Sequence, residues 1–273
     1  MATQAELGTF KKNVCVYYKN HKRDFPWRGT RNPYHILVSE IMLQQTKASK
    51  RTEEKYKAFI KRFPDFKELE SAPLRDVLWQ WQGLGYNRRA KSLKELAKIV
   101  VNDHGGVLPR TKEELVKLPG IGPYTAGAIC VFAYNKPTVF IETNIRTVFI
   151  HFFFDKSKRK ISDEEILKLV DGTLQRTDPR QWYQALMDYG AMLKRKYPNQ
   201  NRRSKHYSKQ SKFEGSNRQL RGRIIKLFLV EKKLTQIRIA KELKAKPQRV
   251  ACLLEDLANE GFLVRYKYTF ILA

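Results

Sequence analysis

Hydrophobic side chains recur at helical spacing along most of this chain. Residues 6–21 carry Leu7, Phe10, Val14 and Tyr17 near helical spacing, which predicts an amphipathic helix. The same pattern, interrupted by proline and glycine, predicts further helices from about Pro33, over 51–70 with a turn near Pro64, after Ala72-Pro73, over 88–103, on both sides of 118–122, and twice between 162 and 193. The pattern therefore predicts an all-α fold for the part of the chain before residue 199.

The pattern changes after Ser216. Three short helical patterns follow, and the last stretch, LVRYKYTFILA, alternates as a small β-hairpin does. Thr235 and Pro247 are typical residues at helix starts, and Gly261 is a typical residue at a helix end. This order resembles a winged helix-turn-helix, so we expect a small winged-helix domain over 217–273.

The third helix of such a domain is expected to enter a major groove of DNA with Lys246, Gln248 and Arg249. Winged helices also mediate protein contacts, and that alternative stays open. The preceding stretch, 199–216, is rich in lysine and arginine and is expected to be a basic linker, with DNA contact as an equal alternative.

The net charge of the chain indicates which class of molecule it binds. The chain has 273 residues, with 54 Lys and Arg against 27 Asp and Glu, which gives a formal net charge of +27. Such an excess, interleaved with 12% aromatic residues, favours a nucleic acid as partner. No apolar run reaches the length of a membrane span, and the polar start is not that of a signal peptide. We therefore expect no membrane partner and a cytoplasmic, nucleoid-associated protein.

The stretch LPGIGPYTAGAI carries the most specific pattern. Gly120 and Gly122 allow a tight turn between two helices, and the free N–H groups at the start of the second helix are suited to bind a phosphate. About twenty residues later the chain delivers a carboxylate, Glu142. A phosphate clamp beside a carboxylate points to chemistry on nucleic acid, whereas an ordinary helical hairpin is the plainer alternative. Thr111 and Glu114 form a capping box that starts the first helix of this hairpin.

This stretch closely resembles the helix-hairpin-helix of the base-excision DNA glycosylase superfamily (HhH-GPD). Three further blocks resemble its MutY-like and thymine mismatch branch: FPWR through MLQQT at 25–46, GLGYNRRA at 83–90 and QALMDYGAM at 184–192. The resemblance implies a two-lobed helix-hairpin-helix domain over 1–198, with the winged helix-turn-helix following the linker.

The resemblance also implies roles for individual residues. Glu40 is expected to protonate the departing base, and Gln44 and Gln45 are expected to fill the space left by a flipped nucleotide. Glu142, with Asn144 beside it, is expected to stabilise the positive charge on the sugar. The family carries aspartate at position 142, so this glutamate adds one methylene group. The alternatives are a surface glutamate at position 40 and a surface or capping glutamate at position 142.

Contacts with the DNA backbone are expected from two blocks. The arginines of the GLGY block, Arg88 and Arg89, are expected to meet the DNA backbone, although a solvated basic face is nearly as good an interpretation. The hairpin residues expected to contact DNA are Leu118, Gly120, Ile121, Gly122 and Thr125.

Some family features are missing. Strand-cutting members carry a lysine where this chain has Tyr124, and a phenol forms no Schiff base, which implies base removal without an efficient AP-lyase step. Many members hold an iron–sulfur cluster with four cysteines after this domain, whereas no cysteine lies between Cys130 and Cys252. We expect no cluster, no metal and no other cofactor. The three cysteines are expected to be buried thiols, and Asp188 is expected to be structural.

Together these features predict a monofunctional glycosylase that flips and removes a base from duplex DNA, acting as a monomer. Adenine opposite guanine or 8-oxoguanine is favoured, with thymine or uracil opposite guanine second; hypoxanthine and alkylated bases also stay open. A catalytically silent protein that binds DNA lesions is the alternative from another class, and a strand-cutting enzyme is third.

Overall fold

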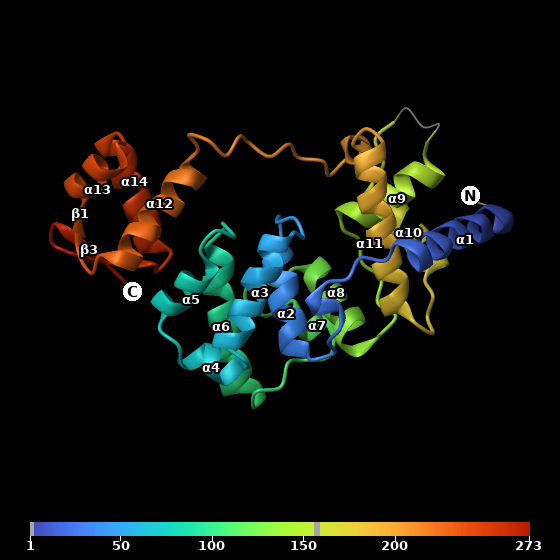
Figure 1. Ribbon diagram of the computed structural model, residues 1–273, viewed down its shortest axis with the longest axis horizontal. Helices are drawn as coiled ribbons and strands as arrows, with labels where there is room; N and C mark the ends of the chain where they lie inside the picture. The colour runs from blue at the N-terminus through green and yellow to red at the C-terminus, as the bar shows by residue number, and fades with distance from the viewer. Residues whose placement is uncertain (1–2, 156–158) are drawn as a thin grey trace. The chain divides into compact units, whose positions relative to one another are not determined.

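The computed structural model describes residues 3–155 and 159–273, and most of them are helical (Figure 1). The helices, in chain order, are α1 Gln4–His21, α2 Pro33–Leu43, α3 Lys50–Arg62, α4 Phe66–Ser71, α5 Leu74–Trp81, α6 Arg88–His104, α7 Lys112–Leu115, α8 Pro123–Tyr134, α9 Thr143–Phe153, α10 Asp163–Thr173, α11 Pro179–Lys196, α12 Asn217–Val230, α13 Gln236–Leu243 and α14 Pro247–Asn259, with the 3₁₀ helices η1 Pro26–Arg28 and η2 Gln200–Arg203. The expected all-α architecture is confirmed.

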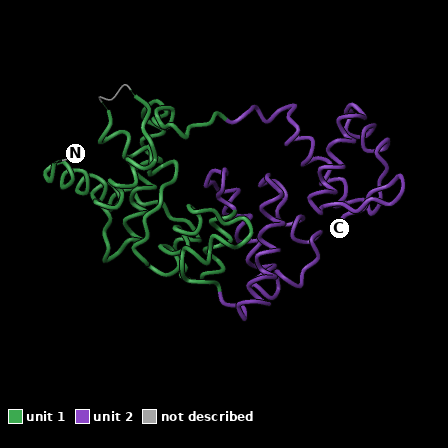
Figure 2. Tube along the Cα trace, turned by 180° about the vertical axis from the view of Figure 1, so that it is seen from behind, with its two compact units in different colours: residues 1–41, 108–209 green, residues 42–107, 210–273 purple. Residues whose placement is uncertain are grey.

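The chain forms two compact units, shown in different colours in Figure 2. Unit 1 contains Met1–Ile41 and Leu108–Lys209, and unit 2 contains Met42–Val107 and Gln210–Ala273. Each unit is therefore built from two separate stretches of sequence. The predicted boundaries of the glycosylase domain, linker and winged helix stay a prediction, because this division follows contacts rather than function.

Local signals set most helix boundaries where they were expected. Pro33 is the first residue of α2, and Gly105 ends α6 with a φ of 59°. Thr111 caps α7 by accepting a hydrogen bond from the Glu114 N–H. The pattern missed the capping box of Thr3 with Glu6, which starts α1 two residues earlier than expected.

Unit 1 has an aromatic core in which α9 packs against α1, α10 and α11. The ring of Phe10 in α1 lies 5.2 Å from Phe149 and 5.9 Å from Trp182, measured between centroids. These tilted and edge-to-face arrangements are the favourable ones for aromatic rings. The core therefore holds α9, the helix that begins directly after Glu142, against its neighbours.

Close packing of α11 on α9 depends on Gly190. A Cβ placed at Gly190 would lie 2.7 Å from the carbonyl carbon and 2.8 Å from the Cβ of Asn144. Real Cβ atoms do not approach other atoms so closely, so only glycine lets α11 lie against the first turn of α9. The position of that turn is thus fixed by a backbone contact rather than by a flexible side chain.

Asp188 in α11 holds the segment that leads to α2. Its carboxylate is buried and accepts from Arg23 Nε at 2.6 Å and from both terminal nitrogens of Arg28 at 2.8 Å. Burial alone would raise the pKa of Asp188, but these donors hold the pKa below its usual value. The expected structural role of Asp188 agrees with this arrangement.

Unit 2 combines α3–α6 with a small mixed domain. In that domain α12, α13 and α14 pack with three short antiparallel strands, in the order β1-β3-β2. The strands are β1 Leu234–Thr235, β2 Leu263–Tyr266 and β3 Thr269–Leu272. The predicted helix order and hairpin are present, whereas β1 is too short for a sequence pattern to show it. Within unit 2, Arg75 of α5 donates to the Leu229 carbonyl of α12 at 2.6 Å.

The structure differs from the predicted basic linker over its first residues. Asn201 of η2 is buried and donates to the Thr147 hydroxyl at 2.7 Å, and Ile161 pairs with Ser204 in a short bridge. Residues 199–204 are therefore packed on unit 1, and an exposed run begins only at Lys205. Among the described residues, no helix is both long and apolar enough to cross a membrane.

We predict that Gly190→Ala lowers the free energy of unfolding by about 1–3 kcal/mol, because the added methyl group collides with backbone atoms of α9. Gly172→Ala is the matched control, since a Cβ there meets nothing within 4 Å and the residue lies in α10. Alanine is the better helix former, so the control should be neutral or stabilising. Urea unfolding measures both; equal effects of the two variants would contradict the close contact.

Candidate active site and DNA-facing hairpin

Glu40 is a buried acid on an apolar helix. Ile36, Leu37, Val38 and Ile41 of α2 are all almost fully buried, so the helix has little polar surface of its own. The Glu40 side chain is buried with them, at 6% exposure, and its Oε2 accepts a hydrogen bond from the Tyr124 hydroxyl at 3.0 Å. A burial this deep contradicts the alternative of a surface glutamate.

Burial raises the pKa of Glu40 to about 7. The hydrogen bond from Tyr124 acts in the opposite direction and lowers this pKa, while the negative charge of Glu142 raises it further. At neutral pH a substantial fraction of Glu40 therefore carries a proton. A carboxylic acid in this state can donate a proton to a bound group.

Tyr124 is the donor in this pair and stays protonated. Burial and the nearby charges of Glu40 and Glu142 raise its pKa well above the usual value. Its ring packs against Phe140, with 5.7 Å between centroids. The hydroxyl thus points at the Glu40 carboxyl group.

Glu142 caps helix α9 with its own side chain. Oε1 accepts from the N–H groups of Asn144 at 2.6 Å and Ile145 at 2.8 Å. Oε2 accepts from the Asn144 side-chain amide at 3.2 Å and from the Thr143 hydroxyl at 3.1 Å. The capping alternative for Glu142 is therefore present in the structure. It does not remove the carboxylate from the site, because the Glu142 charge acts on both Glu40 and Tyr124.

Lys194 joins this group and was not found from the sequence. Its Nζ donates to the Thr143 hydroxyl at 2.9 Å, which makes a chain from Lys194 through Thr143 to Glu142. Desolvation lowers the pKa of Lys194, against the effect of the Glu142 charge, which raises it. Lysine is common at helix ends in this chain, so the sequence does not distinguish Lys194 from the others. Its place beside Thr143 becomes visible only because α11 packs against α9.

Asn201 was also missed, since it lay in the predicted linker. Its side-chain amide donates to the Thr143 carbonyl at 3.0 Å and to Thr147, and so fastens the first turn of α9 from outside. Asn144 itself binds Glu142, as its place beside the carboxylate suggested. The start of α9 is therefore held by Gly190, Asn201 and Lys194, from α11 and η2.

The glycine-rich hairpin forms a tight turn before α8. The Ile121 N–H donates to the Leu118 carbonyl at 3.2 Å, and Gly120 has a φ of 78°, a conformation that favours glycine. Leu118, Ile121 and Thr125 are buried, so their side chains face the protein interior. The expected contact of the hairpin with DNA stays a prediction.

The start of α8 has no side-chain cap, and Pro123 is its first residue. The exposed Gly122 precedes it with a φ of −91°, which any residue can adopt, and a Cβ there would meet nothing within 4 Å. Nothing within the described protein therefore requires glycine at position 122.

In unit 2, Arg88 and Arg89 have different roles. Arg88 is exposed and pairs with Glu260 at 2.8 Å. Arg89 is buried, and its guanidinium donates to the carbonyls of Met42, Gln44, Leu84 and Gly85. The expected contact of Arg89 with the DNA backbone is corrected accordingly: Arg89 holds the turn after α2 and the turn before α6 together.

The remaining predicted residues of unit 2 lie at turns and helix starts. Gln44 and Gln45 follow α2 directly, and Gln45 has a positive φ of 53°. Lys246 and Gln248 are exposed at the start of α14. Arg249 is held within the protein, where Nε donates to Asn217 and a terminal nitrogen donates to the Gly215 carbonyl, both at 2.7 Å.

No group of three or more His, Cys, Asp or Glu side chains among the described residues has the arrangement of a metal site. Cys130 is buried, but Cys15 and Cys252 are exposed, which corrects the expectation of three buried thiols. The expected lack of an iron–sulfur cluster stays a prediction.

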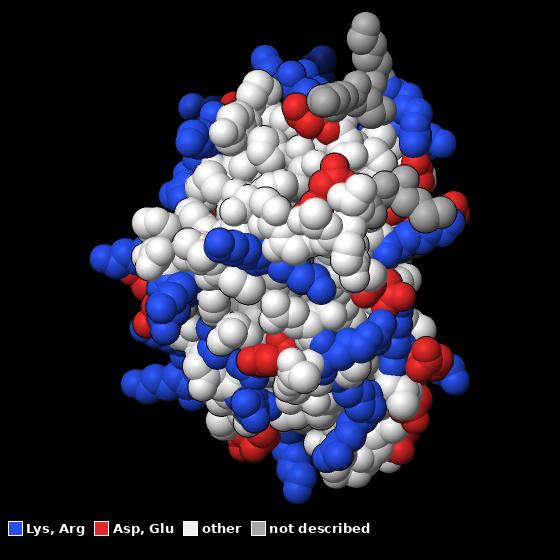
Figure 3. All heavy atoms as spheres, turned by 90° about the vertical axis from the view of Figure 1, so that its right-hand side faces the viewer, with Lys and Arg blue, Asp and Glu red and all other residues white. Residues whose placement is uncertain are grey.

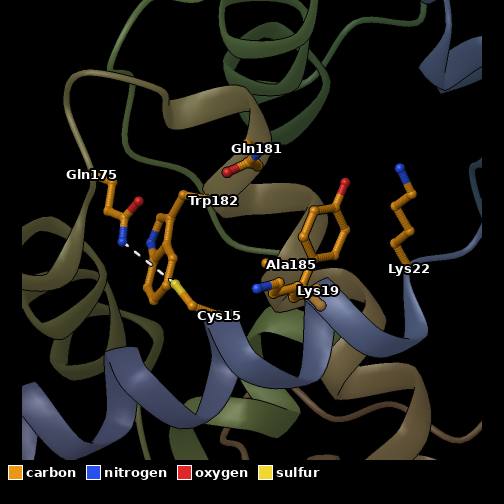
Figure 4. A pocket seen from close by; sticks show the side chains of 8 residues that line it. Cys15, Lys19, Lys22, Gln175, Gln181, Trp182 and Ala185 are labelled. Carbon is orange, nitrogen blue, oxygen red and sulfur yellow. Dashed lines mark hydrogen bonds between the residues drawn. The ribbon is translucent and has the colours of Figure 1, made fainter.

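A hollow of about 350 Å³ lies elsewhere in unit 1, between α1 and α11 (Figure 4). Cys15, Lys19 and Trp182 are among its lining residues, and Gln175 Nε2 donates to the Cys15 sulfur at 3.7 Å. None of the predicted site residues lines it. On the face drawn in Figure 3, lysines and arginines are spread among uncharged and acidic side chains instead of forming one patch.

Comparison with known proteins agrees with this geometry. The family described as HhH-GPD superfamily base excision DNA repair protein matches residues 38–171. An adenine DNA glycosylase of Buchnera aphidicola is 36% identical over 185 residues, which are 67% of this chain and 52% of that protein. A thymine/uracil-DNA glycosylase of Methanothermobacter thermautotrophicus is 30% identical over 194 residues, which are 70% of this chain and 87% of that protein.

The solved structure of a thermostable thymine-DNA glycosylase superposes with a TM-score of 0.63 at 29% identity, covering 70% of this chain and 89% of that one. The chain belongs to the HhH-GPD superfamily of base excision DNA repair proteins. The expected resemblance and fold are thereby confirmed. The chain spans about half the length of the Buchnera adenine glycosylase that it matches.

We predict that Tyr124→Phe raises the pKa of Glu40 above about 7, because it removes the hydrogen bond that stabilises the carboxylate. A carboxyl carbon titration by NMR measures this pKa. Tyr134→Phe is the control, since that half-buried phenol donates to the Leu108 carbonyl instead. An unchanged or lowered pKa in Tyr124→Phe would show that the phenol does not act on Glu40.

Proposed function

We propose that this chain is a DNA glycosylase, which hydrolyses the N-glycosidic bond of a base flipped out of duplex DNA. One observation carries the proposal: a buried acid, Glu40, with a pKa of about 7, within electrostatic reach of the capped carboxylate Glu142. Two carboxyl groups in different environments can divide the work of breaking a glycosidic bond.

Glu40 acts as the general acid in this proposal. Departure of a base leaves negative charge on its ring, and proton transfer from Glu40 neutralises that charge. A catalytic acid works best when its pKa is close to the working pH, and burial brings Glu40 to that value. Tyr124 keeps the carboxyl group oriented through its hydrogen bond.

Glu142 stabilises the positive charge that develops on the sugar as the bond breaks, and it helps to position a water molecule. The oxygen of that water bonds to C1′ of the sugar and the water releases a proton, which completes the hydrolysis. Its charge is fixed by the N–H groups of α9, and α9 is fixed by the close contact with Gly190. Such preorganised charge needs no rearrangement at the moment of reaction. The extra methylene of glutamate is accommodated because the side chain folds back over the first turn of its own helix.

The hairpin positions the DNA. Backbone N–H groups at an uncapped helix start bind phosphate, and the glycine at position 122 leaves room for a phosphate to approach. The net charge of +27 supports duplex DNA as the partner. We propose that the protein acts as a monomer, because all four catalytic candidates, Glu40, Tyr124, Glu142 and Asn144, lie in one unit of one chain.

Adenine is the base that the site favours. Its ring nitrogens accept a proton, whereas thymine and uracil offer carbonyl oxygens, so a buried neutral acid is best matched to a purine. Of the two relatives described above, the adenine DNA glycosylase of Buchnera aphidicola has the higher identity, 36% against 30%. A guanine or 8-oxoguanine opposite the adenine completes this proposal.

Thymine or uracil opposite guanine is the second candidate. It is supported by the coverage of 87% of the thymine/uracil-DNA glycosylase and by the structural match to a thymine-DNA glycosylase. Neither candidate requires a metal or an iron–sulfur cluster for the chemical step.

The proposed reaction stops at the abasic site. Tyr124 offers no amine, and the amine of Lys194 is bonded to Thr143, where it helps to orient Glu142. Lys194 is therefore proposed as a positioning residue rather than a nucleophile.

We predict alkali-dependent cleavage of a labelled duplex containing A·8-oxoG or A·G under single-turnover conditions. T·G, U·G and hypoxanthine·T duplexes are the competing substrates. Glu142→Gln should lower the rate by about 10²–10³-fold, since it removes a preorganised charge, and Glu142→Asp should retain more activity. Glu54→Gln, an exposed glutamate in α3, is the control for the loss of one charge.

Two results would contradict this proposal. Tight binding without product from any duplex would identify a protein that binds lesions and does not cut the glycosidic bond. Strand cleavage without alkali, with a borohydride-trapped adduct that disappears in Lys194→Gln, would identify a strand-cutting enzyme that uses Lys194 as its nucleophile.

A further inference from the structure

A groove of about 1040 Å³ lies within unit 2, apart from the catalytic candidates. One side consists of the turn between α5 and α6 together with Gln44 and Gln45. The other side consists of residues 210–226, which lead into and form most of α12. The groove therefore joins the region that follows α2 to the first helix of the winged-helix part.

The lining is strongly basic. Among the described residues, one carboxylate, Asp256, lines the groove. Besides the buried Arg89, the cations that line it are Arg51, Arg88, Arg218, Arg221, Arg223 and Lys226. Like charges gathered in one groove repel each other unless a polyanion neutralises them.

Three of these six cations have hydrogen-bond partners within the protein. Arg88 and Arg221 both donate to the Glu260 carboxylate, and Arg218 donates to the Tyr86 hydroxyl at 2.7 Å. In the part of the chain that the structure describes, no carboxylate forms an ion pair with Arg51, Arg223 or Lys226. Their side chains are exposed, so three unneutralised charges face the groove.

Aromatic rings accompany the charges. Two guanidinium groups lie near the Tyr86 ring, with 5.4 Å from its centroid to Arg89 and 5.3 Å to Arg218. Tyr86 also has a positive φ of 48°, a conformation that costs about 1 kcal/mol for such a residue and is found at functional sites. Phe213 is 55% exposed beside Arg218. Aromatic and cationic side chains interleaved along a groove are typical of nucleic-acid binding.

The start of α14 is a poorer candidate for this contact. Arg249, which was expected to read bases, has its guanidinium bonded to Asn217 and Gly215. Lys246 is exposed there and does not line the groove. The charges suited to phosphate thus gather on α12, a different face of the winged-helix part.

We propose that this groove binds the sugar–phosphate backbone of duplex DNA, with Arg223 and Lys226 of α12 as phosphate ligands. The stretch from Arg218 to Lys226 is about 12 Å long, which matches three to four successive phosphates along the axis of one DNA strand. The inference rests on the proposed function only for the identity of the partner. In this proposal α12, the first helix of the winged-helix part, contacts the sugar–phosphate backbone of DNA and does not recognise bases.

The test measures binding of a fluorescein-labelled duplex without any mismatch, over a range of salt concentrations. The double variant Arg223→Gln/Lys226→Gln should weaken binding by about 10- to 100-fold near 0.1 M salt, and should reduce the slope of log affinity against log salt by about two. The charge-preserving swap Arg223→Lys/Lys226→Arg should keep the slope, which separates charge from misfolding.

Lys241→Gln/Lys246→Gln is the matched control, because it removes the same charge from α13 and the start of α14. An equal loss of DNA affinity in this control would overturn the proposal. Binding would then depend on the net charge of the protein, or on DNA contact by the third helix of the winged-helix part. Unchanged affinity and slope in Arg223→Gln/Lys226→Gln would overturn it in favour of a protein-binding role. Because the duplex holds no lesion, each outcome is read independently of base excision.

Discussion

Burial of the Glu40 carboxyl group is the constraint on which the rest of the site depends. An ionised carboxylate in an apolar helix is costly, so burial raises the pKa of this carboxyl group to about 7. Within the described part of the chain, the Tyr124 hydroxyl donates a hydrogen bond to it. That arrangement requires α2 to be buried on nearly every side. It also requires a fixed position for the segment between α1 and α2. The buried Asp188 fixes that segment by accepting hydrogen bonds from Arg23 and Arg28.

The second carboxylate is treated in the opposite way. Glu142 is half-buried and accepts four hydrogen bonds, two of them from the backbone at the start of α9. Its place is set by contacts that leave little freedom, above all the approach of α11 at Gly190. One acid is thus kept able to give up a proton and the other is kept as a fixed charge, and this difference in environment supports the proposed division of roles.

Much of the fold could be predicted because its signals are local. Pro33, Gly105 and Thr235 mark helix ends through their own backbone preferences, and each is found where the pattern indicated. Burial is harder to predict, because it depends on what packs on a helix. Leu118 and Ile121 are buried in the hairpin, and the sequence pattern alone did not show that these apolar side chains face the core.

Contacts between residues that are distant in sequence could not be predicted either, because they also depend on how the helices pack. Arg88 and Arg89 are neighbours with the same chemistry, but only Arg89 meets a cluster of carbonyl groups, and those belong to distant turns. Lys194 and Asn201 reach α9 only because α11 and η2 fold back on it. Family motifs identified the two carboxylates, whereas the groups that hold them became visible only in three dimensions.

Proton transfer from Glu40, which is partly protonated near neutral pH, to the leaving base is the central step of the proposed reaction. The most direct test is the single-turnover excision rate of the wild-type protein on its best substrate, measured from about pH 5.5 to about pH 9 with saturating protein. The account predicts a rate that falls above about pH 7, approaching tenfold per pH unit as Glu40 ionises. A rate that stays level or rises across neutral pH would contradict it, because the protonated acid would then not be the reacting form.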